Sequence, residues 1–201
     1  MDSSEYLELL DWRRHVSELF AALRSRTPDA QTLTWFRSKK DTLFRTHPQS
    51  PIPASERANF PGLHYWPHDP AMRVTAHFTP SARKLAGQAE EFSFSRIGDL
   101  HFTLQDQPHS LAAFWIDGYA GGLFVPFRDA TSGRETYGAG RYLVDSIKSA
   151  DLGSDSARDT VTLDFNYAYH PSCAYDPRWI CPLAPPDSRL TIPIRAGERL
   201  S

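Results

Sequence analysis

The chain has 201 residues, a mass of 22.7 kDa and a formal net charge of −2 at pH 7. This near-balance of charge predicts no nucleic-acid partner and no attraction to an anionic membrane surface. Hydrophobic residues make up 40% of the chain and aromatic residues 12%, which is typical of a folded globular protein. No apolar run approaches the roughly 20 residues that span a bilayer, and the acidic N-terminus is unlike a secretory signal, so a cytoplasmic protein is predicted.

A single domain in three parts is predicted. Residues 1–46 form a helical lead-in, because apolar side chains recur at helical spacing over 4–24 and over 30–45. Residues 47–71 are rich in proline and aromatic side chains, which predicts an ordered loop. In residues 72–201, the β core, apolar and polar residues alternate in short runs between Gly, Pro, Asp and Ser turns. These runs lie at 72–78, 92–95, 100–104, 111–116, 123–127, 142–147, 161–166 and 190–194.

About eight short strands of this kind predict a mainly β fold, an antiparallel β-barrel or a two-sheet sandwich with two N-terminal helices. The helices would cover one opening or one face. No dinucleotide fingerprint, phosphate-binding loop or zinc-protease motif occurs in the sequence, so no organic cofactor is predicted. A small-molecule ligand is the expected partner, and a homo-oligomer is compatible with the sequence.

The first polar segment of interest is DATSGRETYGAGRY, residues 129–142. A guanidinium at Arg141 can fork onto a carboxylate or phosphate, and Tyr137 and Tyr142 can supply hydroxyl donors. We therefore predict an anion pocket here, which Arg141→Lys would weaken. The alternative is a tight hairpin in which Arg141 pairs with an internal carboxylate such as Asp164.

The second segment begins as a strand at Thr160 and runs into a proline-rich loop that ends at Pro186. Asp164 and Asn166 lie two residues apart, so a strand places them on one face. With Tyr169 they could bind a polar ligand or move a proton. The alternative is a buried hydrogen-bond network that holds the irregular loop in place.

Cys173 and Cys181 lie in this loop with a C-x7-C spacing that is not typical of zinc ribbons. Two thiols packed as small apolar groups, a reversible disulfide, and zinc bound with the help of His170 all remain open. Cys173 could also be a nucleophile if a neighbouring base or cation lowers its pKa. Our candidate catalytic residues are therefore Asp164, Tyr169 and Cys173.

Lys40 falls on the apolar stripe of the second predicted helix. Its ammonium would then reach either a carboxylate or the mouth of the barrel. The ordinary alternative is a solvated helix charge.

Long irregular motifs give the chain a family resemblance. The segments TYGAGRYL, DFNYAYHPSCAYDPRWICPLAPP and IRAGE, together with KKDTLFRTHPQSPI and FPGLHYWPHDP, resemble the DUF1684 family of bacterial and archaeal proteins, a domain of unknown function. The resemblance implies a shared architecture and a shared pocket, but no activity. One departure is Ser188, where the family usually has an asparagine. The resemblance marks Lys40, Asp41, Pro51, Tyr137, Gly138, Gly140, Arg141, Tyr142, Asp164, Asn166, Tyr169, Cys173, Cys181, Pro182 and Gly197.

Three functions follow as hypotheses. The first is binding of a small polar or anionic metabolite, with acid–base or hydrolytic turnover left open. The second is a redox or metal-binding protein that uses Cys173 and Cys181. The third is a protein-interaction module that docks through aromatic loops. For the first, the predicted ligand-binding residues are Tyr137, Arg141, Tyr142, Asp164, Asn166 and Tyr169.

Overall fold

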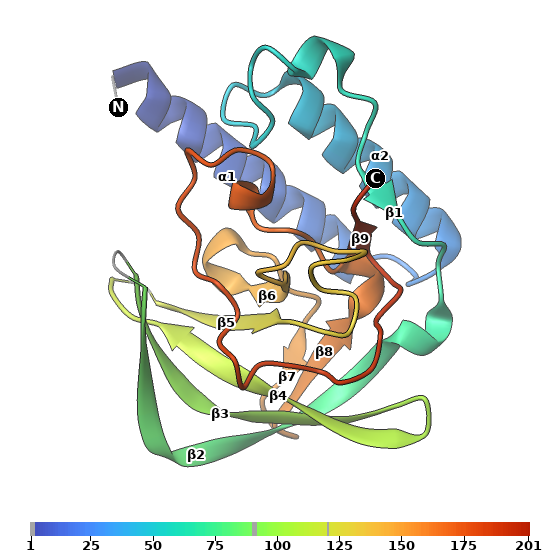
Figure 1. The fold of residues 1–201 in the computed structure, drawn as a ribbon, viewed down its shortest axis with the longest axis vertical. Coiled ribbons are helices and arrows are strands. Elements are labelled where there is room, and N and C mark those ends of the chain that lie inside the picture. The colour runs from blue at the N-terminus through green and yellow to red at the C-terminus, as the bar shows by residue number, and fades with distance from the viewer. Residues whose placement is uncertain (1–2, 90–91, 120) are drawn as a thin grey trace.

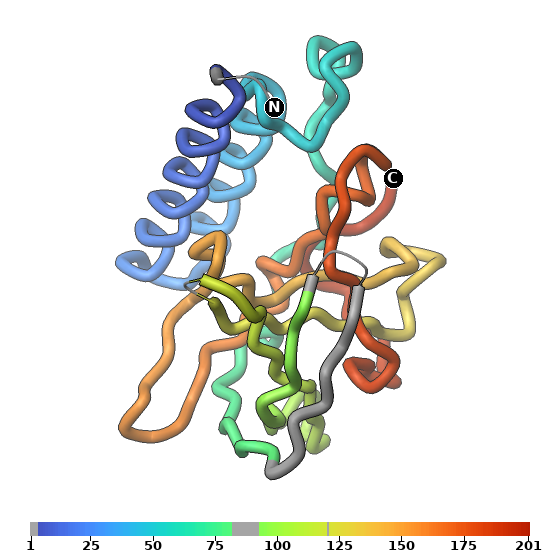
Figure 2. The backbone as a smooth tube through the Cα atoms, turned by 90° about the vertical axis from the view of Figure 1, so that its left-hand side faces the viewer, coloured from blue at the N-terminus to red at the C-terminus, as the bar shows by residue number. Residues whose placement is uncertain are grey.

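The computed structural model describes residues 3–89, 92–119 and 121–201, and it begins with two helices packed side by side (Figures 1 and 2). Helix α1 covers Ser3–Arg24 and α2 covers Ala30–Thr46, so both predicted helices are confirmed. Asp29 caps α2, because its carboxylate accepts the backbone N–H of Thr32 at 2.7 Å. The helix ends before His47, which is extended ahead of Pro48.

Below the helices, seven strands form one sheet that curves into half a barrel (Figure 1). The strand order is β6-β5-β4-β3-β2-β8-β7, and every pair of neighbours is antiparallel. A second sheet pairs β1 with β9, so the end of the chain lies beside the loop that follows α2. The strands are β1 His64–Tyr65, β2 Arg73–Ala89, β3 Phe92–Leu104, β4 Gln107–Ile116, β5 Gly122–Phe127, β6 Arg141–Asp145, β7 Ser154–Asp155, β8 Thr160–Asp164 and β9 Glu198–Arg199.

The predicted mainly β class with two N-terminal helices is confirmed, while three local predictions need correction. The runs 92–95 and 100–104 belong to one long strand, β3. Residues 190–194 are not a strand; Leu190 and Ile194 are buried, but this segment crosses the core as irregular backbone. Asn166 does not continue β8, because residues Phe165–Tyr167 turn into a short 3-10 helix capped by Asp164.

The main core fills the concave side of the sheet and is closed by the C-terminal segment. Leu100, Phe127, Phe165 and Ile194 are at most 2% exposed and belong to this cluster. A second cluster joins the helices to the short helix after β8, where the ring of Phe36 meets Tyr167 edge-on at 5.0 Å. Within the described residues, no helix combines the length and the apolar character needed to cross a bilayer.

Gly197 positions the last strand, because it has a φ of +76° and lies against backbone. A Cβ at this position would lie 2.5 Å from the carbonyl oxygen of Ala168 and 2.6 Å from that of Phe165. Only a residue without a Cβ fits both the positive φ and this close approach.

We expect Gly197→Ala to destabilise the protein by about 1–3 kcal/mol more than Gly153→Ala, because overpacking adds to the backbone strain. Gly153 is the matched control, since its φ is +102° and a Cβ there would meet nothing within 4 Å. Urea unfolding of both variants measures the difference. Equal losses in the free energy of unfolding would mean that the close carbonyl oxygens at Gly197 do not destabilise the alanine variant.

Candidate functional site

A pocket lies between the two helices and the segment that follows β8. Its cavity volume, counted as the space open to water-sized atoms, is about 80 Å³, and its lining is mostly apolar. Aromatic and aliphatic side chains of α1 and α2 form one wall, and the opposite wall comes from the sheet and the loop after it. The lining residues are Trp12, Val16, Leu19, Phe20, Phe36, Lys40, Leu43, Phe44, Pro51, Tyr142, Lys148, Ala150, Tyr169, His170, Pro171, Ser172 and Tyr175.

One lining residue, Lys40, belongs to a buried ion pair. The ammonium of Lys40 donates a hydrogen bond to the Glu198 carboxylate, and the two side chains are 11% and 2% exposed. The same ammonium lies 4.7 Å from the ring centre of Tyr169 and 5.2 Å from that of Phe44. Lys40 therefore reaches a carboxylate, as one of its two predicted interpretations required.

Glu198 is held from two further directions. Its Oε2 accepts the backbone N–H of His170 at 2.7 Å and the hydroxyl of Tyr175 at 2.6 Å. Burial alone would raise the pKa of Glu198, but the charge of Lys40 and the side-chain hydrogen bonds from Lys40 and Tyr175 outweigh burial and hold the pKa below its usual value. The carboxylate is consequently charged, buried and fully bonded.

His170 is neutral in this environment. Burial lowers its pKa to about 4, assisted by the positive charges of Arg141 and Lys40 and opposed by Glu198. The ring nitrogen Nε2 accepts the backbone N–H of Tyr137 at 3.3 Å, which places the ring proton on Nδ1. Nδ1 lies 3.8 Å from Glu198 Oε2, so the N–H side of the neutral ring is turned toward the carboxylate. The negative charge of Glu198 is neutralised by Lys40 and not by His170.

Of the six predicted ligand-binding residues, Tyr142 and Tyr169 line the pocket. Burial raises the pKa of both phenols, and the Tyr142 hydroxyl donates to the backbone carbonyl of Pro182. The backbones of the two tyrosines exchange hydrogen bonds of 2.9 and 3.2 Å, which joins β6 to the loop after β8. Tyr142 and Tyr169 therefore line the pocket and also stabilise the contact between β6 and the loop.

Arg141 is a structural residue and is only 1% exposed. Its guanidinium donates to Asp129 Oδ2 at 2.6 Å and to the carbonyl oxygens of Ile194, Ala196 and Glu198 at 2.7, 2.5 and 3.0 Å. The alternative of an internal ion pair therefore holds, with Asp129 as the partner instead of Asp164. Arg141 ties β6 to the C-terminal segment, and its donors do not reach the pocket.

Asp164 and Asn166 form a separate buried network. Asp164 accepts from Asn166 and from Arg73, the latter at 3.1 Å. The amide of Asn166 exchanges hydrogen bonds of 2.9 and 2.8 Å with the backbone of Asp69. These contacts hold the irregular loop, as the second interpretation of this segment predicted. Arg141 takes part in none of these hydrogen bonds.

Next to His170 lies a small cluster that consists of Tyr137, Cys173 and Cys181. The Tyr137 hydroxyl contacts the Cys173 sulfur at 3.9 Å, and the Cys173 N–H contacts the Cys181 sulfur at 3.4 Å. Both cysteines are free thiols, and burial together with the neighbouring Cys181 raises the pKa of Cys173 to about 11. Cys173 is therefore protonated at neutral pH, which disfavours a nucleophilic role.

The sequence did not predict three residues that complete these contacts. They are Glu198 and Tyr175 in the Lys40 ion pair, and Asp129 as the partner of Arg141. Glu198 and Tyr175 lie within the family motifs but are not among the predicted site residues, and Asp129 begins the polar segment 129–142 without a predicted role. One signal was present in the sequence: a lysine on an apolar helix stripe needs a carboxylate partner. Ser188 is also structural, since its hydroxyl donates to the carbonyl of Pro126 and the residue is fully buried.

Because Arg141 is buried, we now expect Arg141→Lys to act on stability. A lysine cannot serve the carboxylate and three carbonyls at once, so the loss should be roughly 3 kcal/mol. Arg195→Lys is the control, because that arginine pairs with Glu135 at the surface, where its side chain is 59% exposed, and should cost far less. Chemical denaturation compares the two, and similar losses would contradict the role given to Arg141.

The depressed pKa of His170 predicts a loss of stability in acid. Below its unfolded pKa of 6.5 the unfolded chain binds a proton that the native imidazole refuses until about pH 4. The free energy of unfolding should therefore fall between these values, by up to about 3 kcal/mol. His170→Gln should remove this part of the slope, whereas His77→Gln, an exposed control, should keep it. Superimposable pH profiles for the parent and His170→Gln would refute the assignment.

Comparisons with known proteins agree with the motifs. The family model described as a protein of unknown function, DUF1684, matches residues 58–199. The solution NMR structure of an uncharacterized protein from Haloarcula marismortui is 37% identical, covers 85% of this chain and 93% of its own, and superposes with a TM-score of 0.61. No match was found among curated proteins. The chain thus belongs to the DUF1684 family.

Proposed function

We propose that the protein binds a small molecule with an apolar body and one terminal acceptor group, such as a carboxylate or carbonyl oxygen. The observation that carries this proposal is that Lys40, a nearly buried cation, lines a mostly apolar pocket. The sequence predicted a small polar or anionic metabolite bound at Arg141. The proposal keeps one polar or anionic group, gives the rest of the ligand an apolar body, and moves the binding site from Arg141 to Lys40.

The Lys40 ammonium can donate more hydrogen bonds than the one it makes to Glu198. A lysine ammonium can donate three hydrogen bonds, and among the described residues Glu198 is the one acceptor that Lys40 meets. The ammonium also lies near the rings of Tyr169 and Phe44, and Lys40 lines the pocket. An oxygen of a ligand could accept a charge-assisted hydrogen bond from it, and such bonds are stronger than those between neutral groups.

The walls favour an apolar ligand body. Trp12 and Phe44 pack with ring centres 5.7 Å apart, and Val16 and Leu19 continue this surface along α1. Lys148 also lines the pocket and pairs with Asp145 at 3.1 Å, so both lining lysines have a carboxylate partner. A neutral surrounding of this kind recognises one acceptor group by hydrogen bonding and does not select for high negative charge.

We propose binding without turnover. The lone pair of His170 Nε2 is engaged by a backbone N–H, and the Cys173 thiol is protonated at neutral pH, so neither is a ready base or nucleophile. Redox pairing of the two cysteines stays a second candidate, since the backbone of Cys173 already contacts the Cys181 sulfur. The cytoplasmic location predicted from the sequence would keep such a pair reduced.

The test compares aromatic and branched aliphatic carboxylates with the corresponding amides and hydrocarbons, by ligand-observed NMR and calorimetry. We expect Val16→Phe, which fills the pocket, to abolish binding. Ala21→Phe, on the exposed face of the same helix, should leave binding unchanged. Binding that survives Val16→Phe would exclude this pocket.

A second variant tests Lys40 without leaving a bare buried charge. Lys40→Met combined with Glu198→Gln removes both members of the ion pair and keeps the shape, which proteins often tolerate. We expect carboxylate affinity to fall about tenfold relative to the amide, the equivalent of one charge-assisted hydrogen bond. An unchanged preference for the carboxylate would exclude Lys40 as its partner.

A further inference from the structure

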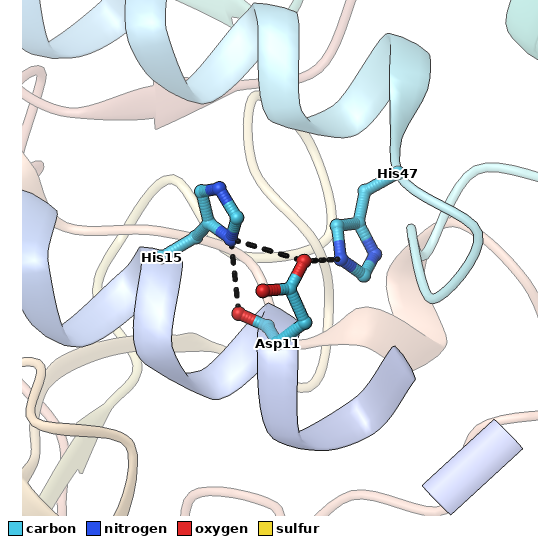
Figure 3. A group of neighbouring side chains, drawn as sticks. All are labelled: Asp11, His15 and His47. Carbon is cyan, nitrogen blue, oxygen red and sulfur yellow. Dashed lines mark hydrogen bonds and ion pairs between the residues drawn. The ribbon is translucent and has the colours of Figure 1, made fainter. Parts of the chain in front are cut away.

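Outside the pocket, two imidazoles and a carboxylate converge where α1 meets the end of α2 (Figure 3). Asp11 and His15 are four residues apart on α1 and therefore share a face of the helix. His47 directly follows α2, and its backbone N–H closes that helix on the Leu43 carbonyl. Among the described residues, this is the group of His, Cys or carboxylate side chains whose three ligand atoms lie within 4.8 Å of one another.

We propose that Asp11, His15 and His47 form a site for one divalent transition-metal ion such as Zn²⁺. Two imidazoles and one carboxylate are ligands that Zn²⁺ favours, with a water molecule completing four-coordination. This site is distinct from the cysteine site with His170 that the sequence left open. His15 and His47 also line a groove between α1 and α2, from which a metal ion and its water would enter.

The spacing of the ligand atoms fits a tetrahedral ion. Two atoms that each bind Zn²⁺ at about 2.05 Å lie about 3.3 Å apart in tetrahedral geometry. Asp11 Oδ2 lies 3.3 Å from His47 Nε2 and 3.5 Å from His15 Nδ1. Only the two imidazoles need to approach one another. Asp11 and His15 are about half exposed, so they can make this adjustment.

Metal binding must shift a proton on each ring. In the structure His15 Nδ1 donates to the Asp11 carbonyl at 3.0 Å, and His47 Nδ1 accepts the N–H of Gln49 at 3.0 Å, which leaves the His47 proton on Nε2. A metal ion at His15 Nδ1 and His47 Nε2 moves these protons to the opposite nitrogens. Three coordination bonds replace a few weak hydrogen bonds, so binding prevails, although it should be weaker than at a site built in advance.

The ion would fasten α1 to the end of α2 beside the pocket. The Trp12 ring lies 5.3 Å from the His47 ring and 5.7 Å from Phe44, and both Trp12 and Phe44 line the pocket. The metal site does not depend on the proposed ligand, because its own binding is measured directly.

The experiment uses the full chain, with any affinity tag removed, after dialysis against a chelator. Calorimetry with Zn²⁺ should show one site, and Co²⁺ should give the strong visible bands of a tetrahedral ion. Asp11→Asn and His15→Gln should each weaken Zn²⁺ binding at least tenfold. His64→Gln, which replaces an exposed histidine outside the cluster, should leave it unchanged.

Nitrogen NMR of the parent protein removes any dependence on variant folding. Zn²⁺ should move the His47 ring proton from Nε2 to Nδ1, and the His15 ring should respond at the same metal concentration. The proposal is overturned if Zn²⁺ leaves both rings unchanged, if the Co²⁺ complex is octahedral, or if His64→Gln lowers affinity as much as His15→Gln does.

Discussion

The buried carboxylate of Glu198 joins three separate parts of the chain. Lys40 comes from α2, the N–H of His170 and the hydroxyl of Tyr175 come from the loop after β8, and Glu198 itself opens β9. A buried carboxylate without partners would cost several kcal/mol, so all three donors must be in place when the protein folds. The helices, the loop and the chain end are therefore held in one arrangement, in which Lys40, His170 and Tyr175 line the pocket.

The two buried cations, Arg141 and Lys40, have different roles because they differ in how many hydrogen bonds they donate within the protein. Arg141 donates to Asp129 and to three backbone carbonyls, which holds the C-terminal segment over the core. Within the described part of the chain, Lys40 has one carboxylate partner, Glu198, and it lines the pocket. A planar fork with several donors suits a permanent structural tie, whereas an ammonium with free donors suits a group that binds and releases a ligand.

The lining of the pocket comes from two parts of the chain. The family model matches residues 58–199, which include the lining residues Tyr142, Tyr169 and His170, whereas α1 and α2 precede this range. The helices supply the other apolar wall and Lys40, and α1 together with His47 supplies the side chains of the proposed metal site. Lys40 connects the two parts, because it lies on α2 and pairs with Glu198 inside the matched range.

The sequence by itself determined the helices, most strands and the family. Spacing of 3.6 and of two residues, a proline after His47 and long motifs are local signals, and local signals decide secondary structure. Tertiary structure alone decided the partners. Arg141 pairs with Asp129 instead of Asp164, and Lys40 meets Glu198 across 158 positions. A sequence pattern shows on which face a side chain lies, but the depth of that face and the group opposite it depend on how distant segments pack.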